Sequence, residues 1–167
     1  MEYKVINNFL DKDFFTFVQN IIMAKNEDKK QDMAYFFNST IAHTHDKNDH
    51  YYFTHTLYQY DEPRSDYYFS IVKPIVKKLN VKTLIRAKVN LYPRTHKLIH
   101  HAPHTDYPYP HKGCVLSINT CDGYTQLGDK KIPSIENQAL LFDSSIEHNS
   151  TSCTNTQARF NININYF

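Results

Sequence analysis

Glycine is scarce in this sequence, with three residues among 167. No Gly-x-Gly-x-x-Gly run and no phosphate loop is present, which argues against nucleotide cofactors held by such loops. Tryptophan is absent, and cysteine is limited to Cys114, Cys121 and Cys153. An odd number of cysteines without Cys-x-x-Cys spacing supports neither a disulfide framework nor a zinc–cysteine site. Reduced, mostly buried thiols are therefore expected.

Long apolar runs and a strong net charge are also missing. No run is long enough to cross a bilayer, and the N-terminal MEYKVINNFL lacks a basic stretch followed by an apolar one, so we expect a cytoplasmic protein without membrane contact. A formal net charge of +2 is too small to argue for nucleic acid by itself. With 41% hydrophobic residues, the chain should form one globular domain, 1–167.

Helical periodicity dominates the first part of the chain. A short strand at Tyr3–Leu10 is expected to precede a helix of about fifteen residues that is capped by Asp11. A second helix should begin at Pro63 and end near Leu79, and Pro74 should kink or split it because proline removes an internal hydrogen bond.

The region 33–60 is rich in aromatic residues and histidine. We expect a strand at Tyr51–Tyr58 after an exposed loop at 46–49. The spacing of the four histidines selects no metal geometry, although such a tract can bind metal: His43, His45, His50 and His55.

From residue 82 onward the periodicity alternates. In Lys82–Tyr92 and Ala158–Phe167, apolar side chains leave one face and polar ones the other. The polar faces carry Arg86, Lys88, Asn90 and Tyr92 in the first strand, and Arg159, Asn161, Asn163 and Asn165 in the second. Such strands fit a small barrel that holds a charged ligand inside while helices cover its apolar face. A plain sheet with its polar side in water fits the same pattern.

Shorter strands are expected between these two. They are Gly113–Thr120, a hairpin of 124–127 with 130–133 around Gly128-Asp129, and Gln138–Phe142. The Asp-Gly pair in Cys121–Gly123 predicts a turn. A loop at 143–147 then leads to His148.

His104-Thr105-Asp106 is the only His-x-Asp triplet in the chain. In an extended segment its imidazole and carboxylate leave the same side of the backbone, so one metal ion can take both. With His148 as a third ligand, the set becomes two histidines and one carboxylate, the arrangement of non-haem Fe(II) oxygenases. A fortuitous triplet and surface metal ligation without catalysis are the alternatives.

The order of these residues resembles the Fe(II)- and 2-oxoglutarate-dependent dioxygenase superfamily. His104-x-Asp106 is followed by about forty residues of strand and hairpin, then by His148, and Arg159 comes eleven residues later. The segment from Gly123-Tyr124-Thr125 to His148 is similar to compact prolyl-hydroxylase-like members, including bacterial and phage ones. The resemblance implies a mostly β fold with α, a double-stranded β-helix barrel with helices on the major sheet. Residues 81–167 would form its core, and 1–80 the helical support and substrate-loop region.

The resemblance also implies roles for individual residues. His104, Asp106 and His148 would be the catalytic iron ligands, and Arg159 would bind the distal carboxylate of 2-oxoglutarate. Asn90-Leu91-Tyr92 resembles the Asn-x-Tyr of nucleic-acid alkylation-repair dioxygenases, in which both side chains touch the cosubstrate. The spacing to His104 is longer here, and Tyr92 as an aromatic packed at the rim is the alternative.

The implied cofactors are Fe(II), 2-oxoglutarate as cosubstrate and O₂, with succinate and CO₂ released as a C–H bond is hydroxylated. Retention of Asp106 favours hydroxylation over halogenation, because halogenating relatives lack this carboxylate. Tyr107 and Tyr109, in a proline-stiffened segment after the triplet, are candidates for a substrate loop or for simple packing. His100 and His101 are expected to be polar loop residues.

Three functions remain open on the sequence alone. The first is hydroxylation of a protein or peptide side chain such as proline, or of a small molecule. The second, less favoured, is removal of N-alkyl groups from nucleic acid, with phosphate contacts from Arg86, Lys88 and Lys112. The third is a non-catalytic binding module of the same fold, although an idle site has no physical need for four inward polar groups.

Overall fold

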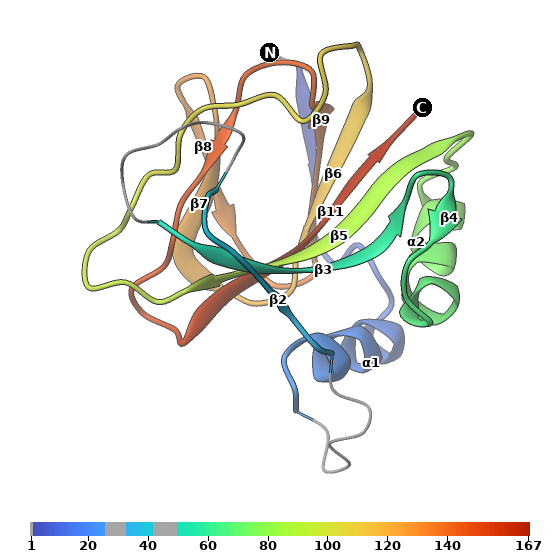
Figure 1. The fold of residues 1–167 in the computed structure, drawn as a ribbon, viewed down its shortest axis with the longest axis horizontal. Helices are drawn as coiled ribbons and strands as arrows, with labels where there is room; N and C mark the ends of the chain where they lie inside the picture. Colours follow the sequence, from blue (N-terminus) through green and yellow to red (C-terminus); the bar gives the residue numbers. More distant parts are fainter. Residues whose placement is uncertain (1, 26–32, 42–49) are drawn as a thin grey trace.

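The computed structural model of the chain describes residues 2–25, 33–41 and 50–167. The predicted loop at 46–49, with His43 and His45 before it, lies outside these residues. Antiparallel strands form two sheets that face each other across a barrel (Figure 1). This arrangement is the double-stranded β-helix expected from the resemblance.

The larger sheet contains eight strands. Its order is β1 (Tyr3–Ile6), β9 (Gln138–Asp143), β6 (Lys112–Ser117), β11 (Ala158–Tyr166), β5 (Leu84–Pro93), β3 (Tyr52–Gln59) and β2 (Phe36–Asn38), with β4 (Glu62–Pro63) paired to β3. The smaller sheet has the order β10 (Asn149–Ser150), β7 (Cys121–Leu127) and β8 (Lys130–Ser134).

Helix α1 (Lys12–Ile22) starts as predicted, because the Asp11 carboxylate accepts a hydrogen bond from the backbone N–H of Phe14 at 3.0 Å. It is shorter than expected, with 11 residues, since Ala24 takes a left-handed conformation with φ 53° just after the helix. The first strand also ends early, at Ile6, before Asn8 with φ 50°.

The second helical region begins later than predicted. Tyr60 and Asp61 both have positive φ and form a tight turn, so that Pro63 pairs with β3 instead of starting a helix. A π-helical turn at Tyr68–Val72 then leads into α2 (Lys73–Lys78). Pro74 lies in the first turn of α2, where its missing N–H costs little, and the region is split as predicted.

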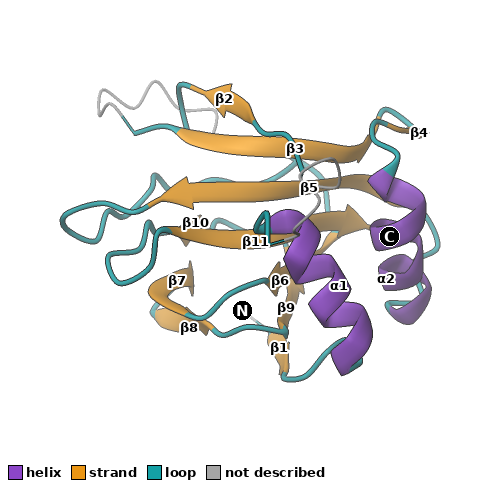
Figure 2. Cartoon of the chain, turned by 90° about the horizontal axis from the view of Figure 1, so that it is seen from below, coloured by secondary structure: helices purple, strands orange, loops and turns teal. Residues whose placement is uncertain are grey.

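The main hydrophobic core lies between the large sheet and the helices, which cover one face of that sheet (Figure 2). This core combines buried side chains from both helical regions with buried side chains from the sheet. The helical regions contribute Val18, Ile22, Ile71 and Ile75, and the sheet contributes Val89, Ile162 and Ile164. All three cysteines are free and buried, as predicted. No helix among the described residues is long and apolar enough to span a membrane.

The opposite face of β5 and β11 lies inside the barrel. Its polar side chains are nonetheless shielded from water, since Asn161 is 3% exposed, Asn165 0% and Arg159 1%. The alternative of a plain sheet with its polar side in water is therefore wrong. A second, smaller apolar cluster fills another part of the space around β6, β7, β8 and β9: Val115, Leu127, Ile132, Leu140 and Phe142.

The Asp-Gly pair at 122–123 was predicted as a turn but lies within β7, at a shift in the register with β8. A Cβ on Gly123 would lie 2.5 Å from the Ser152 carbonyl oxygen and 2.8 Å from Arg159 Cδ. Glycine is used here because the backbone approaches Arg159 closely. The other predicted turn is confirmed, with Gly128 at φ 55° between β7 and β8.

Replacing Ile162 by Ala should lower the free energy of unfolding by about 2–5 kcal/mol, because this fully buried side chain joins the sheet to the helices. Urea unfolding followed by circular dichroism measures the change. Ile135→Ala is the matched control, since Ile135 is 40% exposed and should shift stability by less than about 1 kcal/mol. Equal losses in the two variants would contradict this position of the core.

Candidate metal centre

His104 and His148 are held opposite each other by the backbone. They form an isolated antiparallel bridge in which each N–H donates to the other residue's carbonyl oxygen at 2.9 Å. The two imidazole centroids are 4.6 Å apart. Residues far apart in the sequence are thus brought together by main-chain hydrogen bonds, which do not depend on the side chains.

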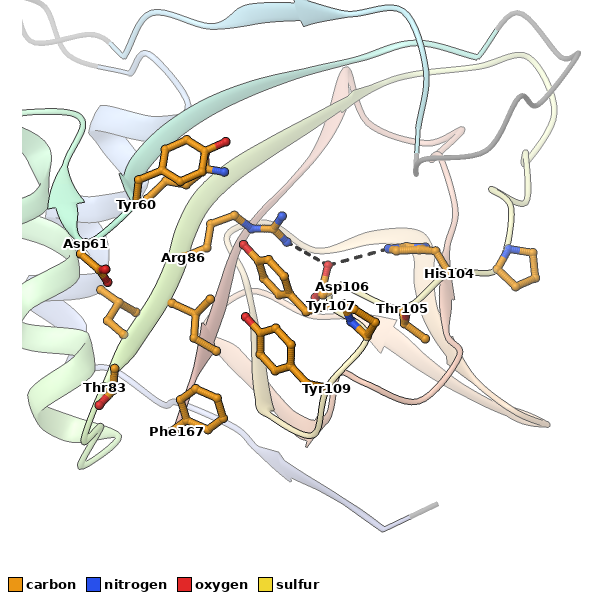
Figure 3. A pocket seen from close by; sticks show the side chains of 15 residues that line it. Tyr60, Asp61, Thr83, Arg86, His104, Thr105, Asp106, Tyr107, Tyr109 and Phe167 are labelled. Carbon is orange, nitrogen blue, oxygen red and sulfur yellow. Dashed lines mark hydrogen bonds and ion pairs between the residues drawn. The ribbon is translucent and has the colours of Figure 1, made fainter.

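Asp106 completes the group. Its N–H donates to the Ser144 carbonyl oxygen at 3.0 Å, which ties the triplet to the loop that leads to His148. One carboxylate oxygen lies 4.0 Å from His104 Nε2, and the other lies 4.0 Å from His148 Nε2. All three ligand atoms fall within 4.8 Å of one another, so one metal ion fits between them as predicted. Figure 3 shows two of the three ligands, His104 and Asp106, beside Arg86.

Backbone carbonyl groups orient both imidazoles. His104 Nδ1 lies 3.3 Å from the Ala102 carbonyl oxygen, and His148 Nδ1 lies 2.9 Å from that of Ile146. A proton on each Nδ1 satisfies these oxygens and leaves the Nε2 lone pairs for a metal. Burial, together with the nearby His148, lowers the pKa of His104 to about 4, so this ligand is neutral at neutral pH.

The Asp106 carboxylate is held by three polar side chains. Arg86 Nη2 donates to Oδ1 at 2.9 Å, and Oδ2 accepts from the amides of Asn165 at 2.8 Å and Asn163 at 3.3 Å. Burial alone would raise the pKa of Asp106, but Arg86, His148 and Asn165 outweigh it and hold the pKa well below its usual range. The carboxylate is therefore ionised and fixed in position.

Arg159 lies inside the barrel and is almost completely buried. Its Nη1 donates to the Thr151 carbonyl oxygen and its Nη2 to Thr125 Oγ1, each at 3.0 Å, while its Nε has no partner. No carboxylate of the described residues forms an ion pair with it. Because a buried cation is costly without an opposite charge, this guanidinium suits an anionic ligand.

The structure brings Tyr92 and Asn90 to the same interior. The guanidinium carbon of Arg159 lies 5.8 Å from the centroid of the Tyr92 ring, which stacks on Tyr52 at 5.5 Å. Tyr92 is 7% exposed, so it is not an aromatic at the rim. Asn90 donates to Asn161 Oδ1 at 2.9 Å, but its own Oδ1 has no partner.

These unpaired atoms test whether the interior fits 2-oxoglutarate. Among the described residues, Arg159 Nε, Asn90 Oδ1 and Asn163 Oδ1 are buried polar atoms without a hydrogen-bond partner. Such atoms are rare in folded proteins and call for a ligand or water. A cation and amides around a histidine–carboxylate group match the chemistry of a dicarboxylic acid beside a metal ion.

Tyr107 and Tyr109 line a groove of about 850 Å³ that reaches the metal centre (Figure 3). Their rings stack with centroids 5.5 Å apart, and the guanidinium of Arg86 lies 5.1 Å from the Tyr107 ring centroid. Tyr60 and Phe167 also line the groove, which we call the aromatic groove after these four side chains. Whether these tyrosines contact a substrate stays a prediction.

His100 and His101 lie outside the metal group. His100 is exposed and packs against Tyr124, in agreement with a polar loop residue. His101 differs from the prediction, because it is 4% exposed and its Nδ1 lies 2.7 Å from Ser150 Oγ. The ring of His55, in β3, bridges the Ala34 carbonyl oxygen and Ser65 Oγ, which is a structural role.

Sequence reasoning missed the residues that surround the metal ligands. Arg86 and Asn165 hold Asp106, and His111 Nε2 lies 3.3 Å from the Asn165 amide. The available signal was the alternation of the two long strands, which placed Arg86 and Asn165 on the polar faces. The pairing of β5 with β11 puts these two residues side by side.

Comparisons with known proteins identify the class of fold. No protein-family model and no curated protein matches the chain. Among solved structures, an oxidoreductase of the 2OG-Fe(II) oxygenase family from Burkholderia pseudomallei aligns with a TM-score of 0.67 and 7% identity, covering 98% of this chain and 84% of that one. The viral collagen prolyl hydroxylase of Paramecium bursaria Chlorella virus-1, in its 2-oxoglutarate complex, aligns with a TM-score of 0.59 and 12% identity, over 100% and 97% of the two chains.

A third similar structure is that of an epimerase and not of a hydroxylase. The epimerase SnoN from nogalamycin biosynthesis, in complex with Fe³⁺, α-ketoglutarate and nogalamycin RO, aligns with a TM-score of 0.62 and 12% identity, covering 99% of this chain and 78% of that one. The chain therefore has the double-stranded β-helix fold of the 2-oxoglutarate–Fe(II) oxygenases. It also carries an intact His-Asp-His group.

The wild-type protein should bind about one Co(II) per chain, and His148→Ala should weaken binding more than about 100-fold, since even outer partners of metal ligands contribute 10–100-fold. Titration calorimetry with Co(II) under nitrogen measures the affinity. His100→Ala is the control and should bind like wild type, because this exposed imidazole lies outside the group. Loss of binding in that control alone would place the metal elsewhere.

Proposed function

We propose that this protein is an Fe(II)- and 2-oxoglutarate-dependent oxygenase that hydroxylates a C–H bond. The observation that carries the proposal is the convergence of three ligand atoms within 4.8 Å at a barrel interior that also contains Arg159, which is buried and has no acidic partner among the described residues. A metal site alone would need no such cation. A binding module without chemistry would need neither group, because both are costly to bury.

His104, Asp106 and His148 would hold the iron. Bound iron, together with 2-oxoglutarate and O₂, supplies the oxidising power for hydroxylation, with succinate and CO₂ as products. The Ala102 and Ile146 carbonyl oxygens lie beside the Nδ1 atoms, so they favour the tautomers whose Nε2 lone pairs face the metal. Arg86 keeps Asp106 ionised, and burial keeps His104 neutral at neutral pH.

Arg159 would bind the distal carboxylate of 2-oxoglutarate, and Asn90 and Tyr92 would line the same site. The Arg159 guanidinium is fixed by Thr125 and Thr151, so it is already oriented before the ligand arrives. Its Nε is a buried donor without a partner, and a carboxylate oxygen can accept from it.

The substrate would enter through the aromatic groove beside the metal centre. Stacked Tyr107 and Tyr109 suit a flat or extended group, such as a proline-containing peptide segment, and the viral collagen prolyl hydroxylase has a similar fold. A small molecule is equally compatible with the fold, given SnoN. Nucleic acid is less favoured because Arg86 and Lys88 line cavities at the metal centre.

Adding Fe(II) and 2-oxoglutarate under nitrogen should produce a weak visible charge-transfer band, and air should then yield succinate. His104→Ala should abolish both signals because it removes one iron ligand. Absorption spectroscopy and succinate analysis measure them, with His100→Ala as the unaffected control. If the wild-type protein gives no band and forms no succinate, the proposed function is refuted.

Arg159→Met should raise the half-saturating concentration of 2-oxoglutarate at least about tenfold, because one charge-assisted pair is lost. Arg159→Lys should recover part of this loss, since Lys keeps the charge without the planar fork. Succinate formation as a function of 2-oxoglutarate measures the effect, and exposed Arg94→Met is the control. If Arg159→Met left the half-saturating concentration of 2-oxoglutarate unchanged, another cation would have to bind the distal carboxylate.

A further inference from the structure

A second cavity, smaller and more polar than the aromatic groove, adjoins the metal centre. It has a volume of about 190 Å³ and is lined by Lys88, Tyr52 and Tyr92, with His104 and Asp106 from the metal group. This is room for about six water molecules, or for the polar end of a small organic ligand. Arg86, His104, Thr105 and Asp106 line both spaces, so the metal centre lies where they meet.

Lys88 is the unexplained residue in this cavity. Its Nζ lies 3.4 Å from the Tyr52 hydroxyl and 5.5 Å from the centroid of that ring. No carboxylate of the described residues is within ion-pair distance of it. Burial, with a smaller effect of Arg86, lowers the pKa of Lys88 to about 7, and the attraction of Asp106 only partly opposes this shift.

The charges of the proposed enzyme leave Lys88 without an anion even when its cofactors are bound. Asp106 would be shared between Arg86 and a ferrous ion, one carboxylate of 2-oxoglutarate would also face the iron, and Arg159 would bind the second carboxylate. Among the described residues, no further carboxylate lies within ion-pair distance of Lys88. In an oxygenase of this kind, the third molecule at the site is the substrate, which can supply that anion.

We propose that Lys88 binds a carboxylate of the substrate, and that the protein therefore oxidises carboxylic acids or acidic peptides. The carboxylate would occupy the small cavity, and the rest of the substrate would extend past the metal centre into the aromatic groove. A carboxylate is favoured over a phosphate group, because a phosphate carries close to two negative charges, and of the two cations that line this cavity Arg86 is already paired with Asp106. Burial raises the pKa of Tyr52 well above its usual range, so its hydroxyl stays neutral and can position the ammonium group.

The inference rests on the proposed function, but its test does not require turnover. The probes are 3-phenylpropionate and its uncharged amide, 3-phenylpropanamide, which share shape and aromatic ring. Each is titrated calorimetrically into protein saturated with 2-oxoglutarate, both with Fe(II) under nitrogen and without metal. Saturating 2-oxoglutarate keeps the probes away from Arg159. A preference for the acid over the amide therefore reports on Lys88.

The wild-type protein should bind the acid at least about tenfold more tightly than the amide, since a hydrogen bond between two charged groups is the stronger kind. Lys88→Met, which keeps chain length and packing, should remove this preference, and Lys88→Arg should keep it. Lys112→Met is the matched control because Lys112 is exposed and does not line this cavity. Lys88→Met should be at least as stable as wild type to heat, because it removes a buried charge.

Equal affinity for the two probes, or binding of neither, would overturn the inference. So would a Lys88→Met variant that loses affinity for 2-oxoglutarate, because Lys88 would then be a cosubstrate residue. If the acid preference depends on Lys88 while no charge-transfer band or succinate forms, the acid site stands and the proposed oxygenase activity fails. A free acid is distinguished from an acidic peptide by repeating the titration with N-acetyl-glutamate amide, whose only carboxylate is on the side chain.

Discussion

The pairing of β5 with β11 is the constraint on which the rest of the molecule depends. These strands run antiparallel from Leu84 opposite Tyr166 to Pro93 opposite Ala158. Alternate side chains reach the helix-covered core on one side and the barrel interior on the other. Slipping this pair by one residue would place isoleucines in the barrel and asparagines under the helices, so the core and the site are fixed by one register.

The barrel interior concentrates positive charge around a single carboxylate. Arg86 and Arg159 come from the two paired strands, and Lys88 lies two residues beyond Arg86. Of these three cations, only Arg86 forms an ion pair with an acidic side chain of the described residues. The helix-side core and the smaller apolar cluster must therefore offset the cost of holding the buried Arg159 and the partly buried Lys88 without an acidic partner. A ligand that supplied the missing charge would stabilise the fold, so we expect stability to rise when an anionic ligand binds.

Several features were predictable because they depend on local pattern. Two-residue alternation placed the long strands and their polar faces, and the order His104, Asp106, His148 matched the observed group. Other features depend on tertiary contacts. The Asp122-Gly123 pair predicts a turn, but Gly123 lies in a strand, where the Ser152 carbonyl oxygen and Arg159 leave no room for a side chain. Likewise, no local signal shows that Lys88 has no carboxylate of the described residues within ion-pair distance.

The reciprocal hydrogen bonds between His104 and His148 have a consequence for divergence. Since the main chain sets the separation of the two rings, neighbouring side chains can drift without moving the ligands. Similar folds with 7% or 12% identity to this chain agree with that freedom. Substitutions can thus reshape the walls around this pair of imidazoles, and so change which molecules fit, without altering the distance between the two backbones.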